Sequence, residues 1–259
     1  MSLLKTPAEI AALREGGAIL TRALQASMKV CVAGASTIEI DAAARRSMES
    51  EGAKPSFLGY RISPDDTPFP STLCISIDDE VVHGPATPAR IIAKNSVVSL
   101  DIGCWYKGLA TDMATTLIIG DEPPKVHALV ADTRESLVRG LAAIKAGNTV
   151  MDIGGAVEDY LKPKKYGIVQ DLVGHGVGHA VHEEPSIPNY REPRAPRVVL
   201  QEGMVLAIEP MVTLGDKRVY VKDDDWTIAT RDHSLAAHFE VTVAVTKDGY
   251  ELLTPWPDA

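Results

Sequence analysis

The chain has 259 residues, of which 45% are hydrophobic and 24% are charged, and it carries a formal net charge of −9. This composition suits a globular protein with a sizeable core, and its acidic balance argues against direct sequence-specific binding of nucleic acid, which requires a basic surface. The three cysteines are scattered and form no CxxC pair, which argues against a zinc knuckle and a disulfide framework. The chain shows no secretory signal and no apolar run long enough to span a bilayer, which argues against a membrane protein. We therefore expect a cytoplasmic location.

The first half of the chain is predicted to contain two helices followed by strands. The sequence Thr6-Pro7-Ala8-Glu9 is a capping box with proline at the first helical position, so a helix is expected to begin there. A second helix is expected to begin near Ser36, with Glu39 three residues further on. The predicted elements are helices to about Val30 and from Ser36 to before Gly52, and strands at Thr72–Ile77, Val97–Cys104 and Leu109–Ile119.

The second half is predicted to follow the same order. Helical patterns at Pro123–Ala146 and Met151–Leu161 precede short apolar runs that alternate with Gly, Pro and Asp turns. Because no long linker interrupts the chain, we expect one domain over residues 1–259. The predicted strands of this half are Val198–Leu200, Val205–Ile208, Arg218–Val221 and Phe239–Val245.

A weak internal repeat relates the two halves. The segment Ala33–Ile40 matches Ala146–Ile153, and each copy lies between two predicted helices. The match predicts an α+β domain with pseudo-twofold symmetry, halves of about 1–120 and 121–259, and a site between them. Similar helix-capping segments also arise by chance, so the repeat alone leaves this organisation open.

The stretch Gly174–Pro185 contains three histidines and two glutamates in twelve residues. Its glycines allow the backbone to approach a neighbour or ligand closely. Two interpretations stay open from this stretch alone, a functional site and a glycine-rich turn with solvated histidines.

Two aspartates are predicted to lie side by side on a β-hairpin whose turn is Lys107–Gly108. That turn places Asp101 opposite Ala114. It places Asp112 opposite Gly103, so both carboxylates project from one face about 7 Å apart. Apolar neighbours flank both residues, and carboxylates buried in this way repel each other unless a cation lies between them. We therefore interpret the pair as a metal site rather than as solvated strand residues.

Two further acids interrupt apolar strands, Glu209 after Val205–Ile208 and Glu240 within Phe239–Val243. Four such carboxylates carry a charge of −4, which two divalent cations would balance. An oxygen-rich shell with one imidazole favours ions like Mn²⁺, Fe²⁺ or Co²⁺ over a thiolate zinc site. A pair of such ions lowers the pKa of a shared water and makes hydroxide available near neutral pH.

The ordered set of motifs resembles the type I methionine aminopeptidases, metallopeptidases of the pita-bread fold. This fold is α+β, with two pseudo-symmetric halves, each a helix pair with antiparallel strands, around a central curved sheet. The resemblance extends from Lys5 to Thr246. The motifs that carry it are Glu80-Val81-Val82-His83-Gly84, Asp101, Thr111-Asp112, Gly174-His175-Gly176, His182-Glu183-Glu184-Pro185, Ile208-Glu209-Pro210-Met211 and Glu240.

The resemblance implies two divalent metal ions, of Co, Mn, Fe, Zn or Ni. It also implies removal of the initiator methionine from nascent proteins, by attack of a metal-bridging hydroxide on the first peptide bond. His83 would lie near the substrate amine, His182 would hydrogen-bond the scissile carbonyl, and Glu209 would also handle the proton of the bridging water. His179 has no counterpart and is expected to lie outside the ligand set. The implied metal ligands are Asp101, Asp112, His175, Glu209 and Glu240.

The resemblance further implies a pocket for the methionine side chain. An aromatic and sulfur-lined cavity suits a flexible thioether, although each pocket residue is equally compatible with an ordinary core position. Phe57 stands where a smaller residue or cysteine is expected, Val181 replaces an aromatic residue, and the segment from Arg61 to Pro70 is longer than in the shortest relatives. The implied pocket residues are Phe57, Tyr60, Phe69, Cys74 and Trp226, together with His83 and His182.

Two alternatives use the same fold. X-Pro dipeptidases and aminopeptidase P share the metal set but usually carry an additional N-terminal domain, whereas this chain begins at the catalytic helices. A non-catalytic binding protein of this fold would have lost ligands that are all present here. The expected partners are N-terminal Met peptides of nascent proteins and, transiently, the ribosome, with the chain itself a monomer.

Overall fold

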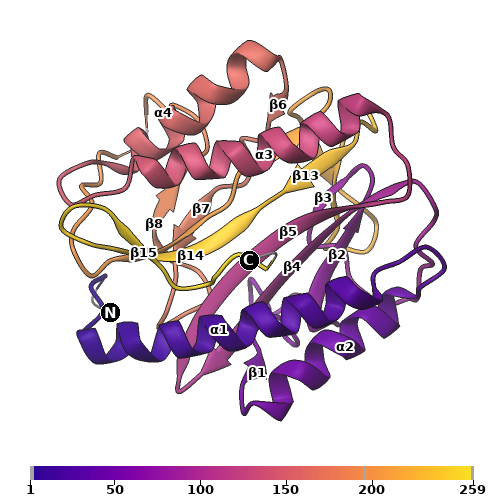
Figure 1. Ribbon diagram of the computed structural model, residues 1–259, viewed down its shortest axis with the longest axis horizontal. Coiled ribbons are helices and arrows are strands. Elements are labelled where there is room, and N and C mark those ends of the chain that lie inside the picture. Colours follow the sequence, from indigo (N-terminus) through magenta and orange to yellow (C-terminus); the bar gives the residue numbers. More distant parts are fainter. Residues whose placement is uncertain (1–2, 195, 258–259) are drawn as a thin grey trace.

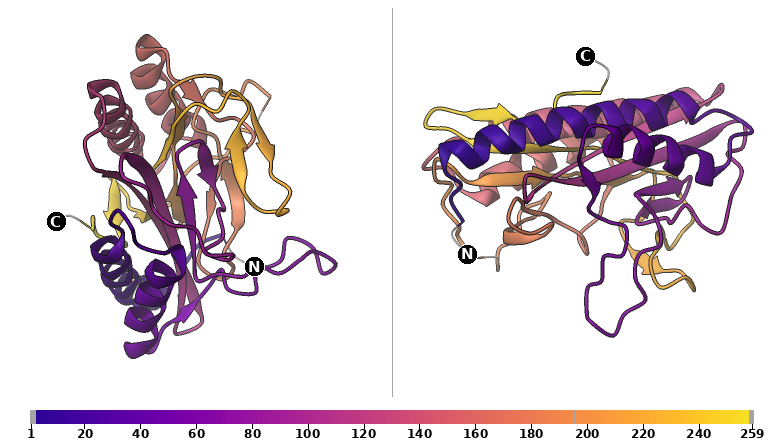
Figure 2. Two further views of the ribbon diagram at one scale, coloured as in Figure 1. Left: turned by 90° about the vertical axis from the view of Figure 1, so that its right-hand side faces the viewer. Right: turned by 90° about the horizontal axis from the view of Figure 1, so that it is seen from below.

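Four α-helices lie on one face of a central β-sheet in the computed structural model, which describes residues 3–194 and 196–257 (Figure 1). The helices lie on one side of the sheet, and most of the long loops lie on the other (Figure 2). None of the helices in the described residues combines the length and apolarity needed to cross a bilayer. The helices are α1 Pro7–Val30, α2 Thr37–Ser50, α3 Pro124–Ala142 and α4 Val150–Leu161, and a short 3₁₀ helix, η1, covers Lys162–Lys164.

The central sheet has nine strands, arranged in the order β1-β4-β5-β14-β9-β7-β8, with β2 paired to β4 and β15 paired to β14. All of these pairs are antiparallel. The pairing of β5 with β14 joins the N-terminal part of the sheet to the C-terminal part. Its strands are β1 Lys54–Pro55, β2 Leu73–Ile77, β4 Ser96–Tyr106, β5 Leu109–Ile119, β7 Gly174–Gly176, β8 Glu183–Ile187, β9 Val205–Ile208, β14 Glu240–Val245 and β15 Tyr250–Leu252.

Two smaller sheets of three strands each complete the described fold, in the orders β13-β10-β6 and β11-β12-β3. Their strands are only two or three residues long and are antiparallel. Their bounds are β3 Glu80–Val82, β6 Gly167–Ile168, β10 Met211–Thr213, β11 Val219–Val221, β12 Ile228–Thr230 and β13 Ala236–His238.

The alternation of side chains along the central strands separates a dry face from a polar one. Ile102 on β4 and Met113 on β5 face the helices, where they are fully buried in a cluster with Leu20 of α1. In the second half, Ile208 and Val241 also face the helices and are buried in a cluster beneath α3 and α4. The residues between these apolar positions therefore project from the opposite face, which carries the acids.

The repeated segments predicted from the sequence have matching local structures. Gly34 and Gly147 both have positive φ angles, of 88° and 94°. The Gly34 amide donates to the carbonyl of Ile92 at 2.8 Å, and the Gly147 amide donates to that of Leu200 at 2.9 Å. Each segment then begins a helix with a capping box, so the predicted correspondence between the two halves is present at the level of hydrogen bonds.

The predicted helices and most of the predicted strands are confirmed, with two corrections. The helix predicted to extend to Ala146 ends at Ala142, because Asn148 donates its side-chain amide to the carbonyl of Ala143 in the turn that follows. The predicted strand Val198–Leu200 is wrong, since Val199 forms only an isolated bridge with Thr149 at the start of α4. Of the strands in the small sheets only β11 was predicted, as Arg218–Val221, because two or three residues carry little alternation.

Candidate metal centre and active site

Strand register brings four of the predicted ligands to one face of the central sheet. Asp101 on β4 and Glu240 on β14 are both paired with Ala114 of β5, one from each side. Asp112 lies two residues from Ala114 and is paired with Gly103, as the hairpin predicts. Because side chains alternate, Asp112 and Ala114 share a face. The register of β14 with β9, extended by one pair, sets Glu209 opposite Glu240 on that same face.

His175 joins this set from the adjoining strand. It is paired with Ala207 of β9, which lies two residues from Glu209, so its ring projects from the acidic face. The flanking glycines are required there because β7 lies tightly between β8 and β9. A Cβ at Gly174 would lie 2.5 Å from the Ala207 carbonyl oxygen, and one at Gly176 would lie 2.2 Å from that of Glu184. Residues 174–176 of the glycine-rich stretch are therefore a closely packed strand around a site residue, and residues 177–182 form the loop to β8.

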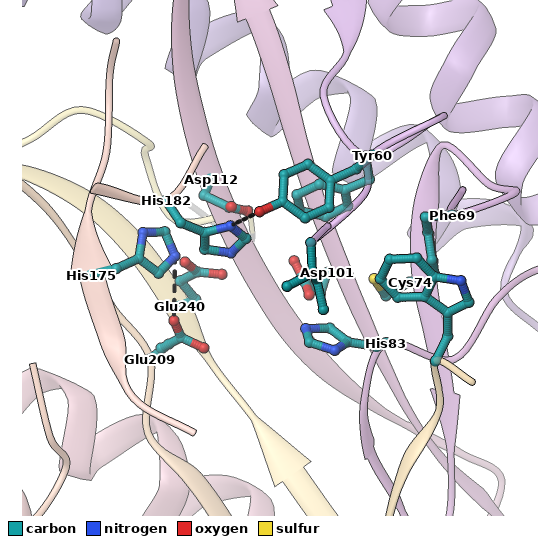
Figure 3. A pocket seen from close by; sticks show the side chains of 13 residues that line it. Tyr60, Phe69, Cys74, His83, Asp101, Asp112, His175, His182, Glu209 and Glu240 are labelled. Carbon is teal, nitrogen blue, oxygen red and sulfur yellow. Dashed lines mark hydrogen bonds and ion pairs between the residues drawn. The ribbon is translucent and has the colours of Figure 1, made fainter. Parts of the chain in front are cut away.

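The five predicted ligands all line one cavity of about 370 Å³. Ligand atoms of Asp112, His175 and Glu240 lie within 4.8 Å of one another. The Nε2 atom of His175 lies 3.5 Å from Oε1 of Glu209. Figure 3 shows these four side chains together, with Asp101 facing them from across the cavity. His175 donates from Nδ1 to the carbonyl of Gly176 at 2.8 Å, which leaves Nε2 unprotonated and free to bind a metal.

The carboxylates of this cluster lack compensating donors. Among the described residues, one buried oxygen of each of Asp101, Asp112 and Glu240 has no hydrogen-bond partner. Burial raises the pKa of Asp101 to about 7 and that of Glu209 to about 8. Burial and the neighbouring carboxylates raise the pKa of Asp112 and Glu240 well above the usual range. A donor set of buried, unpartnered carboxylates with one neutral imidazole fits divalent cations, which would stabilise its charged form.

His182 lies beside this cluster and is held by Tyr60. Its ring makes an edge contact with that of His175, with centroids 4.5 Å apart, and its Nδ1 lies 2.8 Å from the Tyr60 hydroxyl (Figure 3). Burial raises the pKa of Tyr60 and lowers that of His182, so a phenol faces a neutral imidazole. A hydrogen bond donated by this hydroxyl to Nδ1 would place the proton of the ring on Nε2.

His83 reaches the cavity from the loop after β3. Its backbone has a positive φ of 60°, a conformation that non-glycine residues adopt rarely and often at functional sites. Burial and the proximity of two other histidines lower the pKa of His83 to about 4, so its ring is neutral at pH 7. A neutral imidazole both donates and accepts, and this ring lines the same cavity as the carboxylates.

The predicted pocket residues line the remaining wall of the cavity. Phe69 and Trp226 are in edge-to-face contact, with ring centroids 5.2 Å apart, and both pack with Cys74. Phe69, near the end of the segment 61–70, therefore lies on this wall. Val181, by contrast, is buried in a neighbouring apolar cluster and does not line the cavity. The pocket residues brought together are Phe57, Tyr60, Phe69, Cys74 and Trp226.

Three features of the site were missed by the sequence patterns. Ile62, in the lengthened segment, lines the cavity while 77% exposed. Lys5 forms a buried ion pair of 2.6 Å with Glu183, which follows His182 in the sequence. His238 is buried on β13, 3.5 Å from Glu209. A lone histidine or lysine carries no periodic signal, so only its neighbours in space mark it. His179, predicted to lie outside the ligand set, contacts Glu9 at 2.7 Å and does not line the cavity.

Comparisons with known proteins agree with this geometry. The profile of metallopeptidase family M24 matches residues 11–247. A methionine aminopeptidase of Borreliella burgdorferi is 42% identical over 250 residues, which cover 96% of each chain. The crystal structure of a methionine aminopeptidase from Thermotoga maritima superposes with a TM-score of 0.92 at 38% identity, covering 98% of this chain and 99% of that one. A prolidase from Pyrococcus furiosus shares the fold with a TM-score of 0.77 at 25% identity, and 66% of its length is covered.

Fold and site together define a metallopeptidase with a pita-bread architecture. The coverage and identity of the matches go further than the architecture alone. The chain belongs to metallopeptidase family M24 and, within it, to the methionine aminopeptidases. The resemblance indicated by the sequence motifs is thereby confirmed.

Proposed function

We propose that this chain removes the N-terminal methionine from polypeptides by metal-dependent hydrolysis of the first peptide bond. The observation that carries the proposal is the grouping of four carboxylates, three of them buried, and one buried imidazole along an aromatic, sulfur-lined cavity. Two of the relatives named above are methionine aminopeptidases that this chain covers over nearly their full length, and this supports the same assignment.

The metal centre would hold two divalent ions of Co, Mn, Fe, Zn or Ni. Four carboxylates supply the charge that two divalent ions balance, and the buried oxygens without partners supply free donor atoms. Bound ions would supply Lewis-acid activation of water, which makes hydroxide available as a nucleophile near neutral pH. The residues proposed to hold them are Asp101, Asp112, His175, Glu209 and Glu240.

The remaining polar groups of the cavity would orient the substrate and move protons. His182 would donate from Nε2 to the carbonyl oxygen of the scissile bond, where negative charge develops in the transition state. His83 would lie near the substrate amine and accept or donate a hydrogen bond there. Glu209, as a carboxylate, would accept the proton that the attacking water gives up and deliver it to the leaving amine.

The wall of the cavity would receive the methionine side chain. A thioether is flexible and makes favourable contacts with aromatic edges, which the Phe69 and Trp226 rings provide. Cys74 adds a polarizable sulfur that burial keeps protonated, because its pKa is raised well above the usual range. Phe57 and Tyr60 complete this wall beside His182.

We infer a single catalytic domain over residues 1–259, because the proposed ligands come from both halves of one continuous sheet. We also infer a monomer in the cytoplasm, with N-terminal Met peptides of nascent proteins as partners and with transient ribosome association. The three cysteines are buried as free thiols, which suits a reducing compartment.

The proposed function is tested by a paired peptide assay. Metal-free protein is reconstituted with Mn²⁺, Fe²⁺ or Co²⁺ and given Met-Ala-Ser and Ala-Pro-Ser in parallel. We expect metal-dependent release of methionine from the first peptide and no cleavage of the second. Cleavage of Ala-Pro-Ser alone would instead assign the chain to the X-Pro peptidases, and no cleavage of either peptide would indicate a binding protein.

A further inference from the structure

His238 is a wholly buried histidine that the proposed mechanism does not use. Its residue is 1% exposed, and its Nε2 lies 3.5 Å from Oε2 of Glu209. Neither ring nitrogen has a hydrogen-bond partner among the described residues. A buried polar group without a partner costs about 1–3 kcal/mol, so this ring calls for a physical explanation.

The backbone of His238 is fixed from two sides. On β13 it pairs with Met211 of β10. Its amide donates to the Thr116 hydroxyl oxygen at 2.9 Å, and that hydroxyl donates to the His238 carbonyl at 2.7 Å. Because Thr116 lies on β5, two residues from Ala114, these bonds tie the position of the ring to the strand that carries Asp112.

Glu209 is thus flanked by two imidazoles. The Nε2 atoms of His175 and His238 lie at the same distance of 3.5 Å, one from each carboxylate oxygen. The two rings differ in one respect, since His175 lines the cavity and His238 does not. Every proposed metal ligand lines the cavity and His238 does not, so His238 contacts Glu209 from outside the proposed set of ligands.

We propose that His238 is a positioning residue for Glu209, donating a hydrogen bond from Nε2 to Oε2 so that the other oxygen faces the metal centre. An imidazole always carries at least one N–H, and a small rotation of either side chain shortens 3.5 Å to hydrogen-bond length. Outer partners of this kind orient ligating carboxylates, and their loss typically costs 10–100-fold in metal affinity or activity. The inference rests on the metal centre of the proposed function.

The test compares His238→Leu, which removes the donor, with His238→Gln, which retains an N–H donor. Mn²⁺ binding to the metal-free proteins is measured by calorimetry, and kinetics on Met-Ala-Ser are measured at saturating Mn²⁺. For His238→Leu we expect metal affinity to fall roughly 10-fold or more and kcat to fall with little change in KM. His238→Gln should restore both to within about 5-fold of the wild type. Wild-type affinity and kcat in His238→Leu would overturn the proposal.

A measurement on the wild-type protein separates positioning from direct ligation and needs a folded His238→Gln variant only to assign the signals. Protein labelled with ¹⁵N in histidine is loaded with Zn²⁺, and the His238 signals are assigned by their loss in His238→Gln. We expect Nε2 of His238 to remain protonated in the loaded protein. Loss of that proton on loading would mean that His238 is itself a ligand, contrary to the proposal. If wild-type protein binds no Mn²⁺ or Zn²⁺, the proposed metal centre fails first, which is a different result.

Discussion

At the scale of single residues, the side chains that matter most are those whose charge has no internal partner. Asp112 shares its face with Glu240 through the pairing with Ala114, and one of its oxygens is buried without a hydrogen bond. Its neighbours are also acids, so the carboxylate of Asp112 does not stabilise the metal-free protein. Such a residue is placed for a ligand and not for stability.

We expect Asp112→Ala to lose metal binding and peptidase activity together, because it removes a central donor of the set. Calorimetric titration with Mn²⁺ and turnover of Met-Ala-Ser measure the two effects. Asp121→Ala is the matched control, since Asp121 is exposed at the end of the same strand, and it should leave both unchanged. Turnover by Asp112→Ala with two bound metal ions would contradict the assignment of this ligand.

We expect Tyr60→Phe to lower kcat by roughly 3- to 10-fold while metal binding stays intact. The substitution removes only the hydroxyl that holds Nδ1 of His182 at 2.8 Å. A hydrogen bond of this kind contributes about 1 kcal/mol, and 1.4 kcal/mol corresponds to a factor of ten in rate. Tyr250→Phe, in an exposed tyrosine on β15, is the control. An unchanged kcat in Tyr60→Phe would show that the hydroxyl does not orient the ring.

At the scale of elements, the loop between β7 and β8 is held in place by the N-terminal segment. Lys5 donates to Glu183 at 2.6 Å, and the other oxygen of Glu183 accepts from the Ala180 amide at 2.8 Å. His179 of the same loop contacts Glu9 in the first turn of α1. The loop carries His182, so the start of the chain sets the position of a proposed catalytic group.

We expect Lys5→Met to destabilise the protein by about 3 kcal/mol, because it leaves Glu183 as a buried carboxylate without its cation. The side chain of Lys5 is fully buried and that of Glu183 is 12% exposed. Urea denaturation of Lys5→Met, Glu183→Gln and the double variant measures the coupling. Lys107→Met is the matched control, since its ion pair with Glu15 is about half exposed and should contribute far less to stability. Equal losses in the two lysine variants would show that burial of the pair has no effect.

At the scale of the whole molecule, the acidic face works against the stability of the metal-free fold. The raised pKa values of Asp101 and Glu209, about 7 and 8, mean that the folded state holds protons that the unfolded chain has released by pH 6.5. The stability contributed by these two groups is present below their ordinary pKa values and is lost as the pH rises through 7 and 8. The pKa values of His83 and His175 are lowered to about 4 and 3, so these two groups affect stability only below about pH 6.5. In that range they make the folded state more stable as the pH rises.

We therefore expect metal-free protein to become less stable between pH 6.5 and pH 8.5, by up to about 1.4 kcal/mol per pH unit for each carboxyl group. Bound Mn²⁺ replaces those protons, so the loaded protein should become more stable relative to the metal-free form as the pH rises. Urea denaturation at both pH values, with chelator or with Mn²⁺, measures the difference. A metal-free protein whose stability does not fall over this range would contradict the raised pKa values.

The match between sequence patterns and structure depends on how local each feature is. The β4–β5 hairpin follows the predicted register at Asp101 and Asp112, because a two-residue turn determines every pair that follows it. The capping box at Thr6 is present as predicted, since its partners lie three residues apart. The predicted strand at Val198–Leu200 is not formed, because the partner of Val199 is Thr149, a helix cap in a distant part of the sequence.

Local patterns in the sequence therefore suffice for the helices, the main hairpin, the donor types of the metal centre and the family. Turns, caps and alternation act over a few residues, and motif order identifies the family even where no contact is known. The tertiary structure alone places His238 against Glu209, Lys5 against Glu183 and Ile62 at the cavity. These contacts join residues far apart in the chain or depend on the path of a long loop. They form through tertiary packing, so no local periodicity in the sequence predicts them.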